Sequence, residues 1–264
     1  AALHTLHFTN LAHGLGVAAI RAERPQLATG LVLNAHSIYA GSAGEADLAA
    51  ATRAFDFHNG VFFGPVFKGE YPESFLSALG DRMPAIEPGD METISQPLDW
   101  WGLNYYTPMR VAHDVSEGAE FPATVPAPPV TDIRTDIGWE VFAPALGDLI
   151  RKLNADYALP ACYITENGAC YNMEVENGAV DDQPRLDYIA EHLGATADLI
   201  REGYPMRGYF AWSLMDNFEW AEGYRMRFGI VHVDYGTQVR TVKKSGKWYA
   251  ELAGAFPKGN HRAA

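Results

Sequence analysis

Residues 161–168, with the sequence ACYITENG, constrain the fold of this chain more than any other stretch. Apolar and β-favouring residues run directly into the carboxylate of Glu166, and the Asn-Gly pair behind it is typical of a loop. The pattern predicts a buried parallel strand that presents one acid at its carboxyl end. In an α/β barrel the reactive groups lie at that end of the strands, so Glu166 is a candidate nucleophile.

The charge and composition of the 264 residues exclude several classes of partner. Hydrophobic residues make up 48% of the chain, which is enough for a sizeable core. The formal net charge of −13 argues against nucleic acid and against an anionic membrane surface, because both bind basic proteins. No apolar run approaches the ~18 residues of a membrane span, and the first residues lack the pattern of a signal peptide.

Cysteine and histidine usage predicts neither a disulfide framework nor a metal site. Cys162 and Cys170 are the only two cysteines, and the other ligands of a zinc site are missing. We expect both to be free thiols in a reducing compartment, which makes a cytoplasmic protein the expectation. His4, His7 and His13 fall on one predicted helix without an acidic ligand, so we interpret them as half-buried helix residues. The sequence predicts no cofactor.

Four predicted strands alternate with helices along the chain. Strands are expected at residues 29–34, 98–106, 161–166 and 206–214. Helices are expected from Leu3 to about residue 22 (loosened at Gly14 and Gly16), and at 45–59, 71–79, 139–157, 185–202 and 248–253. We interpret residues 61–69 as a packed loop with a short helix, 84–94 as a connector, 113–131 as a surface loop and 228–235 as a hairpin arm.

This order predicts an α/β protein with parallel strands. A complete barrel needs eight strand-helix units in ~250 residues, and four parallel strands could also form an open sheet. The chain opens on a helix with no strand before it, and its strands end in polar or aromatic residues suited to a sugar. We therefore expect the second half, strands 5–8, of a (β/α)8 TIM barrel, with residues 1–264 forming the carboxyl-terminal half of one catalytic domain.

Three motifs carry a resemblance to a known family. They are ITENG at residues 164–168, GLNYYT at 102–107 and YFAWSLMDNFEW at 209–220. On these motifs the sequence resembles the family-1 glycoside hydrolases, the β-glucosidase family, over nearly the whole chain. Glu-Asn-Gly alone would carry little weight, whereas the first and third motifs together are highly specific.

The resemblance implies a role for each candidate site residue. Glu166 matches the nucleophile that forms a covalent glycosyl-enzyme with retention of configuration, and Tyr106 matches its hydrogen-bonding partner. Glu219 and Trp220 match residues that hold the hydroxyls of the terminal sugar, and Trp212 matches the aromatic platform beneath it.

Further binding residues are implied at the ends of the first two strands and near Glu219. Asn34 matches a polar group on the aglycone side, Asn104 ends the second strand as a further substrate-binding residue, and Phe218 is expected to form part of the wall. Asp216 and Asn217 are expected to be structural residues that bond the loop backbone. The implied substrate is a β-glucoside or a cello-oligosaccharide.

The acid/base half of a retaining site is missing from the sequence. Retaining hydrolysis uses two carboxyl groups ~5 Å apart, and in the resembled family the second follows an Asn in an Asn-Glu-Pro motif. The only Glu-Pro here is Glu87-Pro88, in the predicted connector. We therefore expect half an active site, inactive alone, which needs an amino-terminal half-barrel polypeptide or a homo-oligomer to complete it.

Several other interpretations stay open. Related retaining activities include a β-galactosidase, a 6-phospho-β-glycosidase and a transglycosylase. Glu222 and Tyr224 precede Arg225 after Trp220, which argues against a phosphorylated sugar because its dianion needs basic residues there. From another class, the chain could be a non-hydrolytic carbohydrate-binding fragment, although intact Glu166 and Tyr106 argue against such decay.

Overall fold

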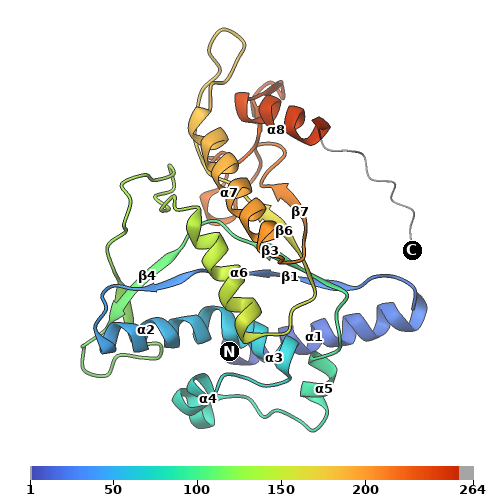
Figure 1. Cartoon of the computed structure of the whole chain (residues 1–264), viewed down its shortest axis with the longest axis vertical. Helices are drawn as coiled ribbons and strands as arrows, with labels where there is room; N and C mark the ends of the chain where they lie inside the picture. Colours follow the sequence, from blue (N-terminus) through green and yellow to red (C-terminus); the bar gives the residue numbers. More distant parts are fainter. Residues whose placement is uncertain (1, 256–264) are drawn as a thin grey trace.

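A four-stranded parallel sheet forms the centre of the computed structural model, which describes residues 2–255 (Figure 1). Its strands are β1 (Gly30–Asn34), β3 (Trp100–Asn104), β6 (Ala161–Asn167) and β7 (Met206–Ala211). They lie side by side in the order β1-β3-β6-β7, which is also their order along the chain. The four predicted strands are confirmed, and their succession is the one expected for consecutive strands of a barrel.

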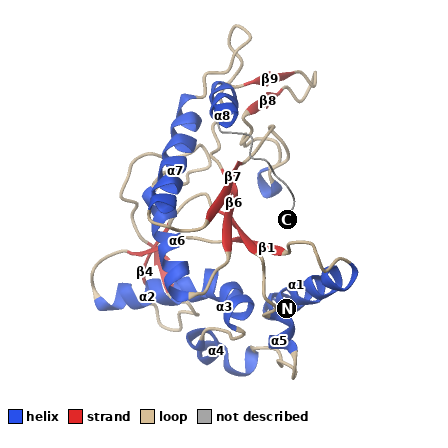
Figure 2. Ribbon diagram, turned by 45° about the vertical axis from the view of Figure 1, so that its right-hand side comes forward, coloured by secondary structure: helices blue, strands red, loops and turns tan. Residues whose placement is uncertain are grey.

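Helices α6 (Pro144–Asp156) and α7 (Gln183–Arg201) cover one face of this sheet (Figure 2). Pro144 stands at the first turn of α6, where its fixed φ suits a helix start. The buried residues of α6 recur at helical spacing and include Leu146, Leu149, Ile150 and Leu153. They meet alternate strand residues such as Ile164, so the core lies between sheet and helices.

The opposite face of the sheet carries exposed apolar residues on its two edge strands. Val32 on β1 is 41% exposed and Phe210 on β7 is 57% exposed, although Leu33, the neighbour of Val32, is buried. Alternation along a strand sends successive side chains to opposite faces, so the exposed residues belong to the inner face of the predicted barrel. A Cβ at Gly102 would lie 2.6 Å from the Thr165 side chain, so this glycine makes room for Thr165 on that face.

The helix predicted from Leu3 is α1 (Ala2–Glu23), and its glycines do not loosen it as predicted. A Cβ at Gly14 would lie 2.0 Å from the carbonyl oxygen of Thr93, so Gly14 lets another segment approach α1 closely. That segment is α5 (Asp90–Ile94), which occupies part of the predicted connector. The glycine therefore serves packing between two helices.

The remaining elements refine the predicted boundaries. The other helices in the described part of the chain are α2 (Glu45–Phe55), α3 (Val61–Lys68), α4 (Glu73–Leu79) and α8 (Lys244–Ala255), with a π-helical turn at Asp56–Gly60 and 3₁₀ turns at Gly80–Arg82 and Trp220–Glu222. Helix α8 begins before the predicted residue 248, and the predicted helix 45–59 ends as the π-helical turn.

Two small sheets flank the main one. Strands β2 (Ile38–Ala40), β4 (Met109–His113) and β5 (Thr124–Pro126) form the first, so the stretch predicted as a surface loop contains an edge strand. Its Pro126 was a reason to expect a loop, but an edge strand tolerates proline because one side needs no donor. Strands β8 (Val231–Val233) and β9 (Arg240–Val242) pair antiparallel, which confirms the predicted hairpin arm.

The histidines and cysteines considered for metal or disulfide chemistry have other structural roles. His7 bonds the Tyr71 hydroxyl and the Asp90 carboxylate, each at 3.0 Å, and so ties α1 to α5. Cys162 and Cys170 are free and buried, and burial raises the pKa of the Cys170 thiol to about 11. Within residues 2–255, no helix combines the length and the apolar character that crossing a bilayer requires.

The buried side chains of β6 should contribute strongly to the free energy of unfolding. Replacing the fully buried Ile164 by alanine should lower the free energy of unfolding by about 2–5 kcal/mol, because a cavity remains between sheet and helices. Ile200 on α7 is 55% exposed, so Ile200→Ala should change the free energy of unfolding by less than about 0.5 kcal/mol. Urea unfolding followed by tryptophan fluorescence measures both, and equal losses would contradict this placement of the core.

Candidate active site

Three polar residues meet where the first three strands of the main sheet end. Asn34 pairs with Asn104 in register, and Asn104 pairs with Glu166. Between β3 and β6 the register shifts, so Thr165 is an extra residue on β6, and its hydroxyl donates to Asn104 Oδ1 at 2.7 Å. Such bulges redirect side chains beside active sites.

The bulge explains why Glu166 does not face the core. Ile164, two residues earlier, is fully buried on the helix-covered face, and a regular strand would send Glu166 to that same face. Instead Glu166 lines a cavity of about 770 Å³ at the end of the sheet. The residues that line it are Asn34, His36, His58, Asn104, Tyr106, Thr107, Pro108, Met109, Gly138, Trp139, Glu140, Glu166, Trp212, Glu219, Trp220 and Phe228.

Tyr106 holds the Glu166 carboxylate. Its hydroxyl donates to Glu166 Oε2 at 2.5 Å. Its ring packs against Trp139 and Phe228, with ring centroids 5.5 Å and 6.1 Å away. Burial, followed by the hydrogen bond and charge of Glu166, raises the pKa of Tyr106 far above its usual range, so the hydroxyl keeps its proton and remains a donor.

Asn167, the residue after the acid, fastens the ends of β3 and β6 together. Its Nδ2 donates to the Tyr105 carbonyl at 2.7 Å and to the Tyr188 hydroxyl at 3.0 Å. The Tyr209 hydroxyl donates to its Oδ1 at 2.5 Å, and the Tyr188 hydroxyl donates to the Tyr106 carbonyl at 2.6 Å. Asn167 is fully buried, so these bonds compete with little water and fix the backbone on both sides of the acid.

Asn167 and Gly168 do not simply break the strand, as their sequence suggested. Asn167 is the last residue of β6, and its carbonyl accepts the Trp212 amide at 2.9 Å. A Cβ at Gly168 would lie 1.8 Å from the Trp212 carbonyl oxygen, so glycine is required here for close approach. The pair therefore places the Trp212 backbone directly beside the strand end that carries Glu166.

Glu219 and Trp220 reach the cavity from the loop after β7. Burial raises the pKa of the Glu219 carboxyl, a hydrogen bond from Trp212 opposes the shift, and the negative charge of Glu166 adds to it. Trp220 is 83% exposed, and its backbone has a left-handed φ of 43°. The cavity therefore combines the carboxylates of Glu166 and Glu219, besides that of Glu140, with aromatic side chains, a combination suited to a sugar ring.

The structure brings most of the predicted site residues together. Asn34, Asn104, Tyr106, Glu166, Trp212, Glu219 and Trp220 all line the same cavity. Phe218 is not among the lining residues; it is 57% exposed and packs against Tyr224, with ring centroids 5.5 Å apart. The roles assigned to these residues through the resemblance stay predictions.

Sequence reasoning did not single out the two histidines of the cavity. His36 and His58 lie edge to face with ring centroids 6.1 Å apart. Asn59 accepts the His36 amide at 3.0 Å and donates to the His36 carbonyl at 2.9 Å, which fixes this arrangement. The position of His36, two residues beyond Asn34 at a strand end, was the one available signal, whereas His58 depends on the π-helical turn.

Glu140 also lines the cavity, but both of its carboxylate oxygens already accept hydrogen bonds. Arg110 Nε donates to its Oε2 at 2.9 Å, and the Val130 amide donates to its Oε1 at 2.9 Å. Burial would raise the pKa of Glu140, but these hydrogen bonds and the charge of Arg110 together lower it. Glu140 is therefore ionised and tied to structure, which makes it a poor general acid.

The charge of Glu166 should be visible in the titration of Glu219. The folded chain binds the Glu219 proton more tightly than the unfolded chain, so the stability from this group is greatest at low pH and falls as pH rises through the raised pKa. Glu166→Gln removes the like charge and should lower the pKa of Glu219, measured by carboxyl ¹³C NMR. Glu251→Gln, on the exposed side of α8, should leave it in place. An unchanged Glu219 titration in Glu166→Gln would contradict this coupling.

Comparison with protein families and with sequences gives one consistent result. Residues 1–256 match the family described as Glycosyl hydrolase family 1. The chain is 72% identical over 264 residues to a β-glucosidase of Agrobacterium sp., covering 100% of this chain and 58% of that protein. It is 39% identical over 253 residues to β-glucosidase A of Thermotoga maritima, covering 95% of this chain and 56% of that protein.

Comparison with solved structures agrees. The virulence factor SghA of Agrobacterium tumefaciens matches with a TM-score of 0.96 and 70% identity, over 97% of this chain and 57% of that one. The same values hold for SghA in complex with its substrate analog salicin. The family 1 β-glucosidase of Thermotoga maritima matches with a TM-score of 0.91 and 37% identity, over 96% and 56% of the two chains. The chain thus spans somewhat more than half the length of these relatives.

Proposed function

The chain belongs to glycosyl hydrolase family 1, and from this membership we propose that it is the nucleophile-bearing, carboxyl-terminal half of a retaining β-glucosidase. Its substrates would be terminal, non-reducing β-D-glucosyl residues of aryl glucosides and cello-oligosaccharides. The observation that carries the proposal is the Tyr106–Glu166 hydrogen bond of 2.5 Å in the cavity that Trp212 and Glu219 also line.

Glu166 would act as the nucleophile. Its free carboxylate oxygen attacks the anomeric carbon, the bond to the aglycone oxygen breaks, and an acid donates a proton to the departing oxygen. Water, deprotonated by the same acid in its basic form, then displaces the sugar and frees Glu166. The Tyr106 hydroxyl keeps the second oxygen of Glu166 in place throughout, because its raised pKa leaves it a donor.

The loop after β7 would hold the terminal sugar. Trp212 offers an aromatic face to the apolar side of the ring, and Glu219 and Trp220 hydrogen-bond its hydroxyls. Asn104, next to Glu166 on the adjacent strand, can reach the same ring, whereas Asn34 lies one strand further, on the aglycone side. Phe218 would form part of the wall around the sugar, although it is not among the residues that line the cavity.

A neutral glucoside fits the cavity better than a phosphorylated one. The described lining residues include neither lysine nor arginine. The arginines after Trp220 have other partners: Arg225 forms an ion pair with Glu222, and Arg227 forms one with Asp216 at 2.8 Å. A 6-phosphate dianion would therefore enter a cavity lined by three carboxylates, and the cation beside them, Arg110, is already paired with Glu140.

We also propose that an amino-terminal half-barrel completes the site. The sequence has no Asn-Glu-Pro motif, and Glu140 is bound to Arg110, so the acid/base comes from outside these 264 residues. The exposed apolar inner face, with Val32 and Phe210, is the surface that this half would cover. The two free, buried cysteines support a cytoplasmic setting.

Complementation tests this function. We expect the chain alone to leave salicin and aryl β-glucosides unhydrolysed. Co-expression with the part of the Agrobacterium β-glucosidase that lies outside the matched 58% should restore activity. Without an acid/base the rate should fall ~10²–10⁴-fold, and loss of the other sugar contacts lowers it further. Rapid turnover by the monomeric chain would contradict the half-site assignment, and turnover by a homo-oligomer would contradict the proposal that an amino-terminal half-barrel completes the site.

Covalent labelling tests the nucleophile. An activated 2-deoxy-2-fluoro-glucoside should label Glu166 in the complemented protein, as read by peptide mass spectrometry, because the fluorine slows hydrolysis of the glycosyl-enzyme. Glu166→Gln should abolish the label and lower kcat by about 10³-fold or more. Glu251→Gln should leave the covalent label and kcat unchanged. Binding of glucosides without any label in the complemented protein would favour the non-hydrolytic interpretation instead.

A further inference from the structure

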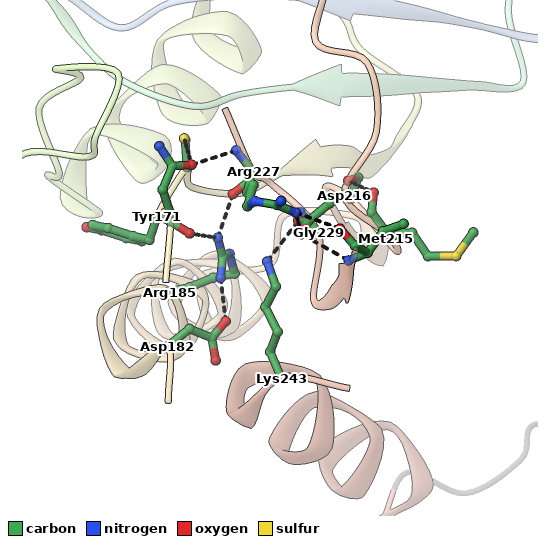
Figure 3. Close-up of polar contacts among 12 residues, drawn as sticks. Tyr171, Asp182, Arg185, Met215, Asp216, Arg227, Gly229 and Lys243 are labelled. Atoms are coloured by element: carbon green, nitrogen blue, oxygen red, sulfur yellow. Dashed lines mark hydrogen bonds and ion pairs between the residues drawn. The ribbon is translucent and has the colours of Figure 1, made fainter. Parts of the chain in front are cut away.

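Asp216, three residues before Glu219, is a buried carboxylate that Lys243 and Arg227 hold (Figure 3). Asp216 Oδ1 accepts Lys243 Nζ at 2.8 Å and the Gly229 amide at 3.0 Å. Its Oδ2 accepts Arg227 Nη1 at 2.8 Å and the Val233 amide at 3.3 Å. Asp216, Arg227 and Lys243 form the Asp216 cluster, which joins the loop after β7 to the residues before β8 and before α8.

A second ion pair extends the cluster toward the strand that carries Glu166. Arg185, fully buried on α7, pairs with Asp182. It also donates to three carbonyl oxygens: Ala169 at 3.1 Å, Tyr171 at 2.8 Å and Arg227 at 2.6 Å. Arg227 thus belongs to both groups: its guanidinium holds Asp216 and its carbonyl is held by Arg185. The contacts of Arg185 and Arg227 therefore connect the loop after β6 with the loop after β7.

The loop that the cluster supports is tight and strained. The Glu219 amide donates to the Gly223 carbonyl at 2.7 Å, and the Glu222 amide donates to the Glu219 carbonyl at 2.8 Å. Trp220, between them, has a φ of 43°, a left-handed conformation that a bulky residue adopts only when its surroundings impose it. Asp216, three residues before Glu219, is where the chain entering this loop is fixed to the core.

Arg227 supports the same loop through aromatic contacts. Its guanidinium lies over the Tyr235 ring, 4.6 Å from the centroid. The Tyr235 ring meets Tyr224 at 4.7 Å, and Tyr224 meets Phe218 at 5.5 Å. Phe218 is the immediate neighbour of Glu219, so displacement of Arg227 would be transmitted to the sugar-facing residues.

Among the residues of these two groups, Lys243 has the least evident structural reason to carry a buried charge. The two connected groups hold three cations, Arg185, Arg227 and Lys243, against the two carboxylates of Asp182 and Asp216. Burial and the charge of Arg185 lower the pKa of Lys243 to about 8, while Asp216 opposes this shift. A fully buried ammonium in a group already rich in positive charge is costly to fold. Such a residue calls for a role beyond filling space.

We propose that Lys243 is a positioning residue for Glu219 and Trp220: by holding Asp216 it fixes the loop that grips the terminal sugar. This rests on the proposed β-glucosidase function. Lys243 is not among the residues that line the cavity and acts only through Asp216. It therefore governs how well the glucosyl ring is bound, while the reactivity of Glu166, held separately by Tyr106, is left in place.

The adjacent lysine provides a matched control. In the complemented protein, Lys243→Met should raise KM for an aryl glucoside about tenfold and change kcat less than about threefold, because binding rather than chemistry is affected. Lys244 is 46% exposed and pairs with Asp181 on the surface. Lys244→Met should change both parameters less than about twofold. If Lys243→Met does not fold, Lys243→Gln is measured instead; its shorter, uncharged side chain loses the ion pair with Asp216, so it should still raise KM more than Lys244→Met does.

A double-mutant cycle separates positioning from mere structure. If Lys243 acts through Glu219, Lys243→Met should cause little further loss of kcat/KM in a Glu219→Gln background. Full additivity of the two losses would overturn the proposal. So would an unchanged KM accompanied by a lower unfolding free energy in urea, and so would equal effects of Lys243→Met and Lys244→Met.

A measurement without turnover keeps this result apart from the proposed function. In the chain labelled with 5-fluorotryptophan, the ¹⁹F resonance of Trp220, assigned with Trp220→Phe, should shift or broaden in Lys243→Met. It should stay unchanged in Lys244→Met. An unshifted resonance in Lys243→Met overturns the positioning role. If the complemented protein neither hydrolyses nor is labelled, the function fails, and the resonance still decides whether Lys243 positions the loop.

Discussion

The pairing of β3 with β6 is the interaction on which the site depends. Because Asn104 lies opposite Glu166 while Leu103 lies opposite Ile164, Thr165 is taken up as an extra residue and the acid is turned away from the helix layer. In a regular ladder Glu166 would face the apolar core, where an ionised carboxylate is strongly disfavoured. One inserted residue thus decides between a misplaced buried charge and a carboxylate that can meet a substrate.

The two residues after Glu166 then make that position rigid. Asn167 joins the ends of β3 and β6 to α7 and β7 through side-chain hydrogen bonds, and Gly168 lets the Trp212 backbone approach closely. Reactive geometry needs precision of a fraction of an ångström, which supporting contacts have to supply. The same short stretch therefore provides both the acid and the means of holding it beside Tyr106.

The other side of the cavity is held in a different way. The sheet presents Glu166 on strand backbone, whereas Glu219 and Trp220 stand on a strained loop that leaves the sheet after β7. Buried ion pairs centred on Asp216, one of them with Lys243 next to the start of α8, hold this loop in place of the hydrogen bonds of a strand. Directional ion pairs can fix a loop at low dielectric, although their desolvation lowers the stability of the fold.

The sequence by itself determined the parallel strands, the amphipathic helices and the acid at the end of β6, because periodicity and β-propensity are local properties. It determined the candidate residues through motifs, but not their contacts. Only the tertiary structure decided that Gly14 packs against α5, that Thr165 forms a bulge, and that His58 reaches the cavity. Lys243 and Asp216 are likewise joined only by folding, since each of these features depends on which distant segments meet, and no local pattern encodes that meeting.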